Sequence, residues 1–124
     1  MGAVSCYFQV DGNDVWNPSS SVARLFVDQG ASLSRLLNVD SGIGEIVEDE
    51  CRVDGPAFEG FTALLVAKYQ EVNNAALRSL LSGFIPLALV LVQRTGGASH
   101  AIHPKDLALW HAALVHVERS MPPG

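Results

Sequence analysis

Residues 75–92 read AALRSLLSGFIPLALVLV, and this stretch decides the fold because it is apolar on nearly every side of a helix. A helix with no polar face must be surrounded by other parts of the protein. Its most apolar run, residues 80–92, contains 13 residues, whereas a membrane span needs about 20. The stretch therefore predicts the core helix of a soluble domain.

Pro86 lies near the middle of this predicted helix. Proline has no backbone N–H, so the carbonyl of Ser82 loses its usual helical partner and the helix should bend. A chain of 124 residues has difficulty enclosing such a helix on all sides. We therefore expect residues 82–86 to border either a subunit contact or the wall of a pocket.

Three more helices are predicted along the chain. The first covers residues 18–38 and begins after Asn17 with a proline at the first helical position, which is a typical start. The second follows Asp54, where a capping residue again precedes a proline, and the last helix follows His103 in the same way.

The N-terminal segment favours a β-hairpin. Residues 4–10 contain side chains typical of a pleated strand, and the turn DGND at residues 11–14 leads to Val15 and Trp16. We therefore predict an α+β fold that is predominantly α, a bundle of about four helices with a short N-terminal β-hairpin. No internal repeat or linker divides the sequence, so residues 1–124 should form a single domain.

Residues 39–54 allow two interpretations. If they form a strand, alternate side chains share a face, and Asp49 points inward together with Cys51 and Val53. If they form a loop with one turn of helix, the alternation of side chains does not indicate which of them point inward. Both interpretations stay open at this point.

The composition limits the classes of function. Only 17% of residues are charged and 48% are hydrophobic, whereas an average domain is roughly 25% charged. The formal net charge is −5, with two Lys and six Arg scattered singly, which argues against binding of nucleic acid or of an anionic membrane. The apolar surplus must be buried, so we expect a homo-oligomer or a protein partner, or a pocket for an apolar small molecule.

Four acids lie within six residues, at Glu45, Glu48, Asp49 and Glu50. Closely spaced carboxylates raise one another's pKa, so Asp49 or Glu48 is a candidate general base. The segment matches no calcium-loop pattern, and a run of this kind is more commonly a solvated acidic edge.

Other candidates for chemistry are few. His111 flanks the apolar side of the last helix and is a second candidate base, although a hydrogen-bonded interface histidine is the commoner case. Cys6 and Cys51 fit no zinc pattern, and acidic neighbours disfavour Cys51 as a nucleophile because they raise its pKa. No phosphate loop or serine-hydrolase motif occurs. We predict no metal and no cofactor and, since no signal peptide is recognisable, two free thiols in a reducing cytoplasm.

Two groups of apolar residues are candidates for binding. Four aromatic residues are candidate ligand-binding residues, although packing in the core is their more common role: Tyr7, Trp16, Phe84 and Trp110. A seam on the last helix has alternating spacings of three and four, as in a coiled coil, and is a candidate interface: Leu107, Leu114, Val117 and Met121.

Several short segments occur together in a pattern that resembles a known family. They are CYFQV at 6–10, VWNPS at 15–19, VARLF at 22–26, DEC at 49–51 and LSGF at 81–84. Up to about Gly96, the chain resembles a family of small actinobacterial proteins catalogued only as a domain of unknown function. The resemblance implies a bacterial, cytoplasmic setting and carries no functional residues with it.

Two classes of function remain. The first is a non-catalytic module that binds another protein, or itself, through its apolar surplus. The second is a small cofactor-independent enzyme, an isomerase, cyclase or hydrolase, that acts on an apolar small molecule with an acidic general base. An enclosed cavity beside Asp49 would favour the enzyme, whereas exposed acids without a cavity would count against it.

Overall fold

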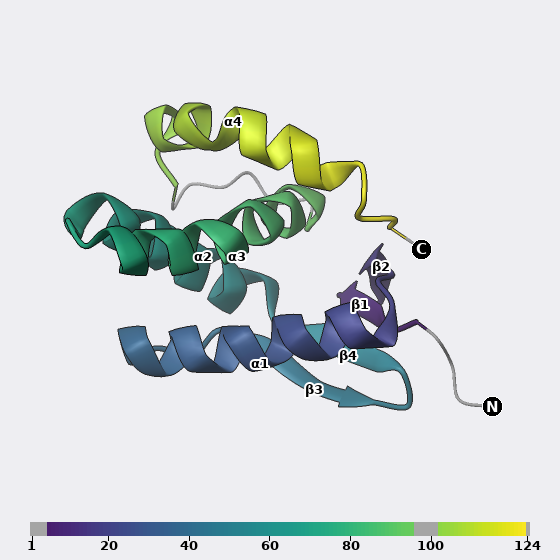
Figure 1. The fold of residues 1–124 in the computed structure, drawn as a ribbon. Coiled ribbons are helices and arrows are strands. Elements are labelled where there is room, and N and C mark those ends of the chain that lie inside the picture. Colours follow the sequence, from purple (N-terminus) through teal and green to yellow (C-terminus); the bar gives the residue numbers. More distant parts are fainter. Residues whose placement is uncertain (1–4, 96–101, 124) are drawn as a thin grey trace.

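Four strands and four helices make up the described part of the chain, residues 5–95 and 102–123 of the computed structural model (Figure 1). In chain order they are β1 (Tyr7–Val10), β2 (Asn13–Trp16), α1 (Ser20–Leu37), β3 (Ile43–Val47), β4 (Glu50–Val53), α2 (Gly55–Glu71), α3 (Ala75–Arg94) and α4 (Pro104–Glu118). The fold is α+β with mostly helix, as predicted, but its sheet is larger than a hairpin. Residue 4, the predicted start of the first strand, lies outside the described residues.

The sheet consists of two hairpins side by side, in the strand order β2-β1-β4-β3. Strands β1 and β2 are antiparallel, as are β3 and β4, and a parallel pairing of β1 with β4 joins the hairpins, with Phe8 opposite Cys51. Each hairpin has a two-residue turn in which both residues have positive φ. The β1–β2 turn is Asp11-Gly12, a preferred sequence for this conformation, whereas the β3–β4 turn is Glu48-Asp49, which is not.

Strand β4 settles the open interpretation of residues 39–54. Cys51 and Val53 are buried on the inner face of the sheet, and Glu50 and Arg52 are exposed on the outer face. Asp49 does not continue this alternation, because it lies in the turn and is exposed. The prediction that Asp49 points inward is therefore wrong, and so is the alternative of a helical turn.

Two of the three predicted capping residues, Asp54 and His103, cap their helices, and Asn74 caps α3 in the same way. The side chains of Asp54 and Asn74 accept hydrogen bonds from the first turns of α2 and α3, and His103 does the same for α4. Helix α1 differs, because its cap is Ser19 and not Asn17. The backbone N–H of Asn17 instead donates to the carbonyl of Pro122 at 2.7 Å, which connects the start of α1 to the C-terminal segment.

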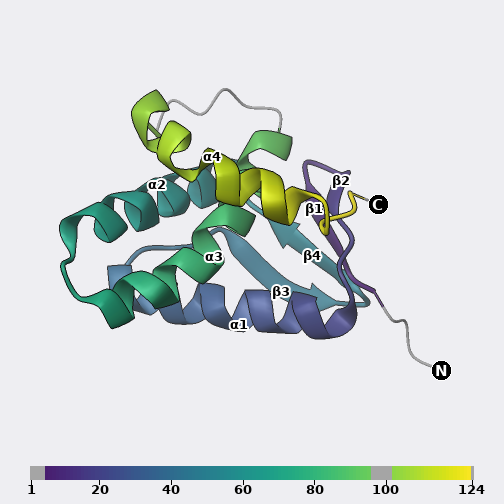
Figure 2. The ribbon, with the colours of Figure 1, turned by 45° about the horizontal axis from the view of Figure 1, so that its top comes forward.

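Helix α3 passes through the middle of the molecule, where it contacts α2, α4 and β2 (Figure 2). With 20 residues it is longer than the apolar run suggested, and by length and composition alone it could cross a membrane. Half of its most apolar window is buried inside the fold. Nine of its residues are buried, including Ile85 and Pro86 around the predicted bend.

An aromatic cluster connects the sheet to the helices. Trp16 on β2 packs edge to face on Phe26 of α1, with ring centroids 5.1 Å apart. Phe26 in turn stacks on Phe84 of α3 at 4.6 Å, with the two rings nearly parallel. Gly30 of α1 is buried against β3, where a Cβ would lie 2.7 Å from the end of the Ile43 side chain, so a larger residue would make that side chain shift.

Candidate functional site

The three candidate catalytic residues do not form a site. Glu48 and Asp49 are exposed at the tip of the β3–β4 hairpin. His111 is exposed on α4, where it lines a shallow hollow of about 380 Å³ together with Gln93 and Leu107. In Figure 1 this hairpin lies at the bottom of the molecule and α4 at the top.

The four candidate ligand-binding aromatics also lie apart. Trp16 and Phe84 are 1% and 2% exposed and belong to the core. Trp110 packs edge to face on Tyr69 of α2, with ring centroids 4.8 Å apart. Tyr7 is exposed on the outer face of the sheet. Trp16 and Phe84 both pack on Phe26, whereas Trp110 and Tyr7 lie elsewhere, so the four do not line a common pocket.

The predicted interface seam on α4 is used inside the chain. Leu114 and Met121 are buried, and Leu107 and Val117 are partly buried against the core. Helix α4 packs on α3, which needs a cover because it is apolar on most sides. These four side chains are therefore wholly or partly buried in the core of the same molecule, and do not form the exposed seam that was predicted.

The two cysteines are free, buried thiols on the inner side of the sheet. Burial raises the pKa of Cys51 to about 12, with a further rise from the neighbouring Cys6. Burial also raises the pKa of Cys6, as do the nearby carboxylates of Asp49 and Glu50. Both thiols are therefore protonated at neutral pH, which leaves them without the thiolate that a nucleophile requires.

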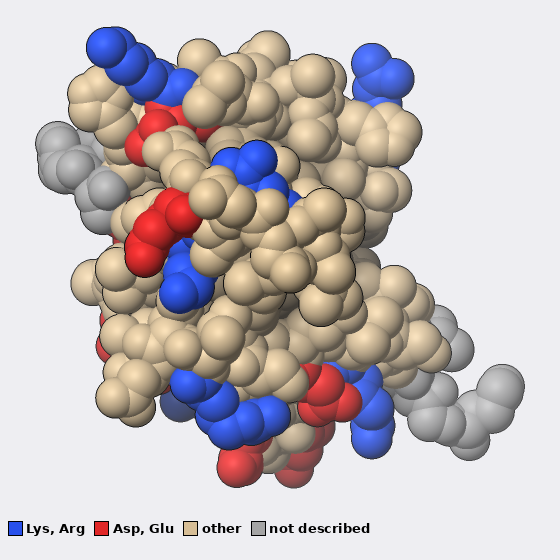
Figure 3. Space-filling view, turned by 60° about the vertical axis from the view of Figure 1, so that its left-hand side comes forward, with Lys and Arg blue, Asp and Glu red and all other residues tan. Residues whose placement is uncertain are grey.

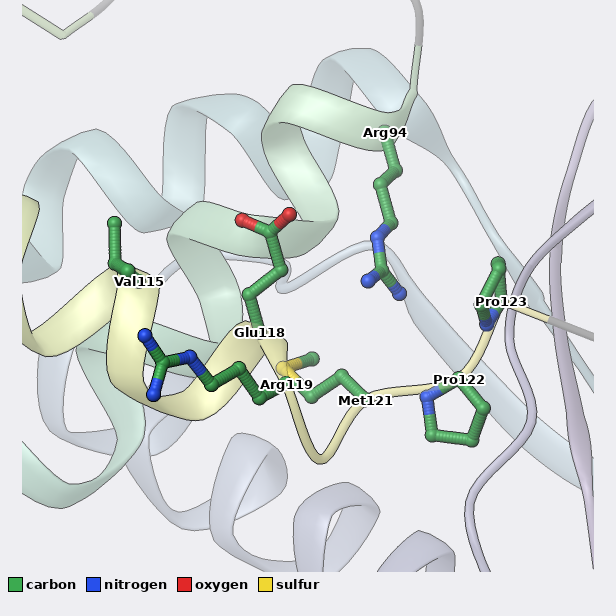
Figure 4. A pocket seen from close by; sticks show the side chains of 7 residues that line it. All are labelled: Arg94, Val115, Glu118, Arg119, Met121, Pro122 and Pro123. Atoms are coloured by element: carbon green, nitrogen blue, oxygen red, sulfur yellow. The ribbon is translucent and has the colours of Figure 1, made fainter.

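A hollow of about 460 Å³ lies between α3, α4 and the C-terminal segment (Figure 4). Arg94 and Glu118 both extend toward it. Arg94 has a structural contact, because its Nη1 donates to the carbonyl of Val15 at 3.0 Å. The hollow lies where the C-terminal segment meets the start of α1, and Arg94 joins α3 to β2 there.

A different surface is apolar, open and uncharged. A groove of about 410 Å³ runs between α1 and α3, and we call it the α1–α3 groove. Its lining residues are Val22, Leu25, Phe26 and Gln29 of α1 and Ser79, Leu80, Gly83, Phe84 and Leu87 of α3. None of these described residues is charged, and toward the right of Figure 3 a broad uncharged surface separates the groups of charged side chains above and below.

Three leucine and valine side chains on this groove extend into solvent. Leu80 is 74% exposed, Leu25 is 58% exposed and Val22 is 43% exposed. Phe84 forms the floor, where it stacks on Phe26. Single exposed leucines are ordinary on a protein surface, but a contiguous apolar patch marks an interaction site.

The groove borders the predicted bend in α3. Gly83 lies between Ser82 and Pro86, is exposed and lines the groove, while Phe84 forms the groove floor and Ile85 and Pro86 are buried. The segment around Pro86 is therefore adjacent to an open groove. That residues 82–86 border a subunit contact or the wall of a pocket stays a prediction. Sequence reasoning did not single out Leu25 or Leu80, because nothing local distinguishes an uncovered leucine from a covered one.

Comparison with known proteins adds a family but no function. A model of a family of unknown function, DUF6086, matches residues 4–123. The comparison with curated proteins found no match, and the comparison with solved structures found none either.

Proposed function

This chain belongs to the DUF6086 family, and we propose that it is a non-catalytic module that binds a protein partner through the α1–α3 groove. The observation that carries the proposal is the uncharged groove with Leu25 and Leu80 exposed along it. Depletion of charge with exposed apolar side chains is the composition found at the centre of protein interfaces.

Burial of the exposed apolar side chains of the groove would contribute free energy to the binding of a partner. Full burial of a leucine contributes about 1.5–3 kcal/mol. Covering the exposed parts of Leu80, Leu25 and Val22 therefore offers on the order of 3–5 kcal/mol before the costs of association. No charged group of the groove loses its hydration in the process, so this gain is not offset by charge desolvation.

The alternative, a small cofactor-independent enzyme, has less support. Such an enzyme needs an acid whose pKa is raised in an enclosed apolar cavity. Glu48 and Asp49 are exposed in a turn, and the hollow beside Glu48 is an open one that also contains Glu45, Glu50 and Arg52. The interaction module requires no such site.

The proposal places the protein in a bacterial cytoplasm, where the free thiols of Cys6 and Cys51 stay reduced.

Site-specific photo-crosslinking in the cells that produce the protein tests the proposal. A benzophenone side chain introduced at Ser79, inside the groove, should give one discrete protein adduct. The matched control is Ala31, which is exposed on α1 but is not part of the groove. No adduct at position 79, or the same adducts at both positions, would refute the proposed function.

A further inference from the structure

We propose that the partner in the α1–α3 groove is a second copy of this chain, held by an antiparallel pair of α3 helices. This inference rests on the proposed function and identifies its partner. It starts from the exposed side of α3, where Ala76, Leu80 and Gly83 are exposed and Leu87 is partly exposed. These four positions follow spacings of four, three and four, so they lie along one stripe of the helix.

The spacing of residues along the stripe is the same from either end. Its centre lies between Leu81 and Ser82. A two-fold axis at that point, with the helices antiparallel, places Leu80 opposite Gly83 of the partner subunit. The same axis places Ala76 opposite Leu87 of the partner subunit. Two-fold symmetry repeats both contacts, as an isologous dimer interface requires.

In both contacts a large side chain faces a small one. Leu80 is 74% exposed. Gly83, one turn away, has open space at its surface, because a Cβ built on it would meet no atom within 4 Å. A protruding leucine and a site that can receive it therefore lie on the same stripe. This steric self-complementarity favours a second copy over an unrelated protein.

Charge and area agree with a second copy. The chain carries a net charge of −5, so two copies repel one another over most of their surface, but no described groove residue is charged. Twelve residues of helix are about 18 Å long and about 10 Å wide, so α3 and the adjoining α1 stripe offer on the order of 400 Å² per copy. Two copies would bury on the order of 800 Å², below the range of permanent interfaces. Interfaces of this size are weak and transient, so we expect a dimer that forms only at high protein concentration.

The test exchanges the large and small residues. Sedimentation velocity of the purified full chain, from about 1 to 500 μM, should show a monomer–dimer equilibrium. Leu80→Ala should weaken it about tenfold by removing the protruding side chain, and Gly83→Leu should weaken it at least tenfold by filling its receiving site. The double variant Leu80→Ala/Gly83→Leu should return to within about threefold of the wild type, because position 83 is then large and position 80 small.

Leu109→Ala is the matched control, because Leu109 is 75% exposed on α4 and lies outside the groove. It should leave the dissociation constant unchanged. Circular dichroism checks that each variant is folded, and Gly83→Ala, which adds only one methyl group, serves if the leucine at that position prevents folding.

Each contrary result identifies what has failed. A wild-type chain that stays monomeric to 500 μM would overturn the homodimer. If position 79 then crosslinks to a different protein, the proposed function stands without the homodimer. A dimer that is weakened equally by Leu109→Ala, or that the double variant does not restore, would also overturn the α3 pairing.

Discussion

The outer face of the sheet and the α1–α3 groove are both open to solvent, but only the sheet face carries charged side chains. The outer sheet face carries Glu50 and Arg52 and ends at the acidic turn, as is usual for the solvated side of an antiparallel hairpin. The groove is uncharged and exposes Leu25 and Leu80. Hydration stabilises the charged side chains of the sheet face, but it does not stabilise the exposed leucines of the groove. In this protein the unexplained surface is therefore the apolar one and not the cluster of ionisable groups.

The largest expected difference in unfolding free energy is between a substitution at the floor of the groove and one on the acidic face. Phe84→Ala should lower the free energy of unfolding by about 3–5 kcal/mol, because Phe84 is 2% exposed and stacks on Phe26. Glu45→Ala, on the exposed side of β3, should change it by less than about 0.5 kcal/mol. Urea unfolding monitored by circular dichroism measures both. Equal effects would show that the groove floor is not part of the core.

The second prediction concerns pH and the thiol under the acidic face. The pKa of Cys51 is about 12 in the folded chain, against an ordinary value of 9.0. Above pH 9 the unfolded chain releases this proton while the folded chain keeps it, so the free energy of unfolding should fall as the pH rises from 9 toward 12. Below pH 8 the thiol should contribute no pH dependence.

Comparison with Cys51→Ala isolates this contribution, because other groups titrate in the same range. The difference in unfolding free energy between wild type and variant should stay constant from pH 7 to 8 and shrink above pH 9. A difference that is constant up to pH 10.5 would contradict the raised pKa of Cys51.

A smaller effect is expected at the tip of the acidic face. Glu48 and Asp49 have φ of 50° and 63°, a conformation that Asn-Gly adopts more readily. Replacing both, as Glu48→Asn/Asp49→Gly, should raise the free energy of unfolding by about 1 kcal/mol. The reverse change in the other hairpin, Gly12→Ala, should lower it by about 1 kcal/mol, since Gly12 has φ of 81°. Destabilisation by the Asn-Gly variant would mean that the acids make contacts that the turn needs.

The smallest effect is expected at the rim of the groove. Leu80→Gln should change the unfolding free energy of the dilute, monomeric protein by less than about 0.5 kcal/mol, because Leu80 is 74% exposed. Leu109→Gln should behave in the same way. A large loss for Leu80 alone would show that this side chain supports the monomer, and the two surfaces would then no longer differ as described.

Short-range signals determined most of the helices and one hairpin. Capping residues such as Asp54 and His103 mark helix starts because they bond to amides two or three residues away. Asp11-Gly12 marks the first turn because its residues accept positive φ. Glu48-Asp49 adopts the same turn without that signature, so the second hairpin could not be recognised. In each case the sequence carries the information only when the interacting groups are close along the chain.

Only the tertiary structure decided how these elements cover one another. The parallel pairing of Phe8 with Cys51 and the bond from Asn17 to Pro122 join residues far apart in the sequence. An apolar stripe shows that a surface will be covered, but not by which element. The seam around Leu114 is therefore indistinguishable in sequence from the stripe around Leu80, although α4 covers α3 with the first and leaves the second open. The physical reason is that hydrophobic burial has no direction, so geometry alone selects the partner.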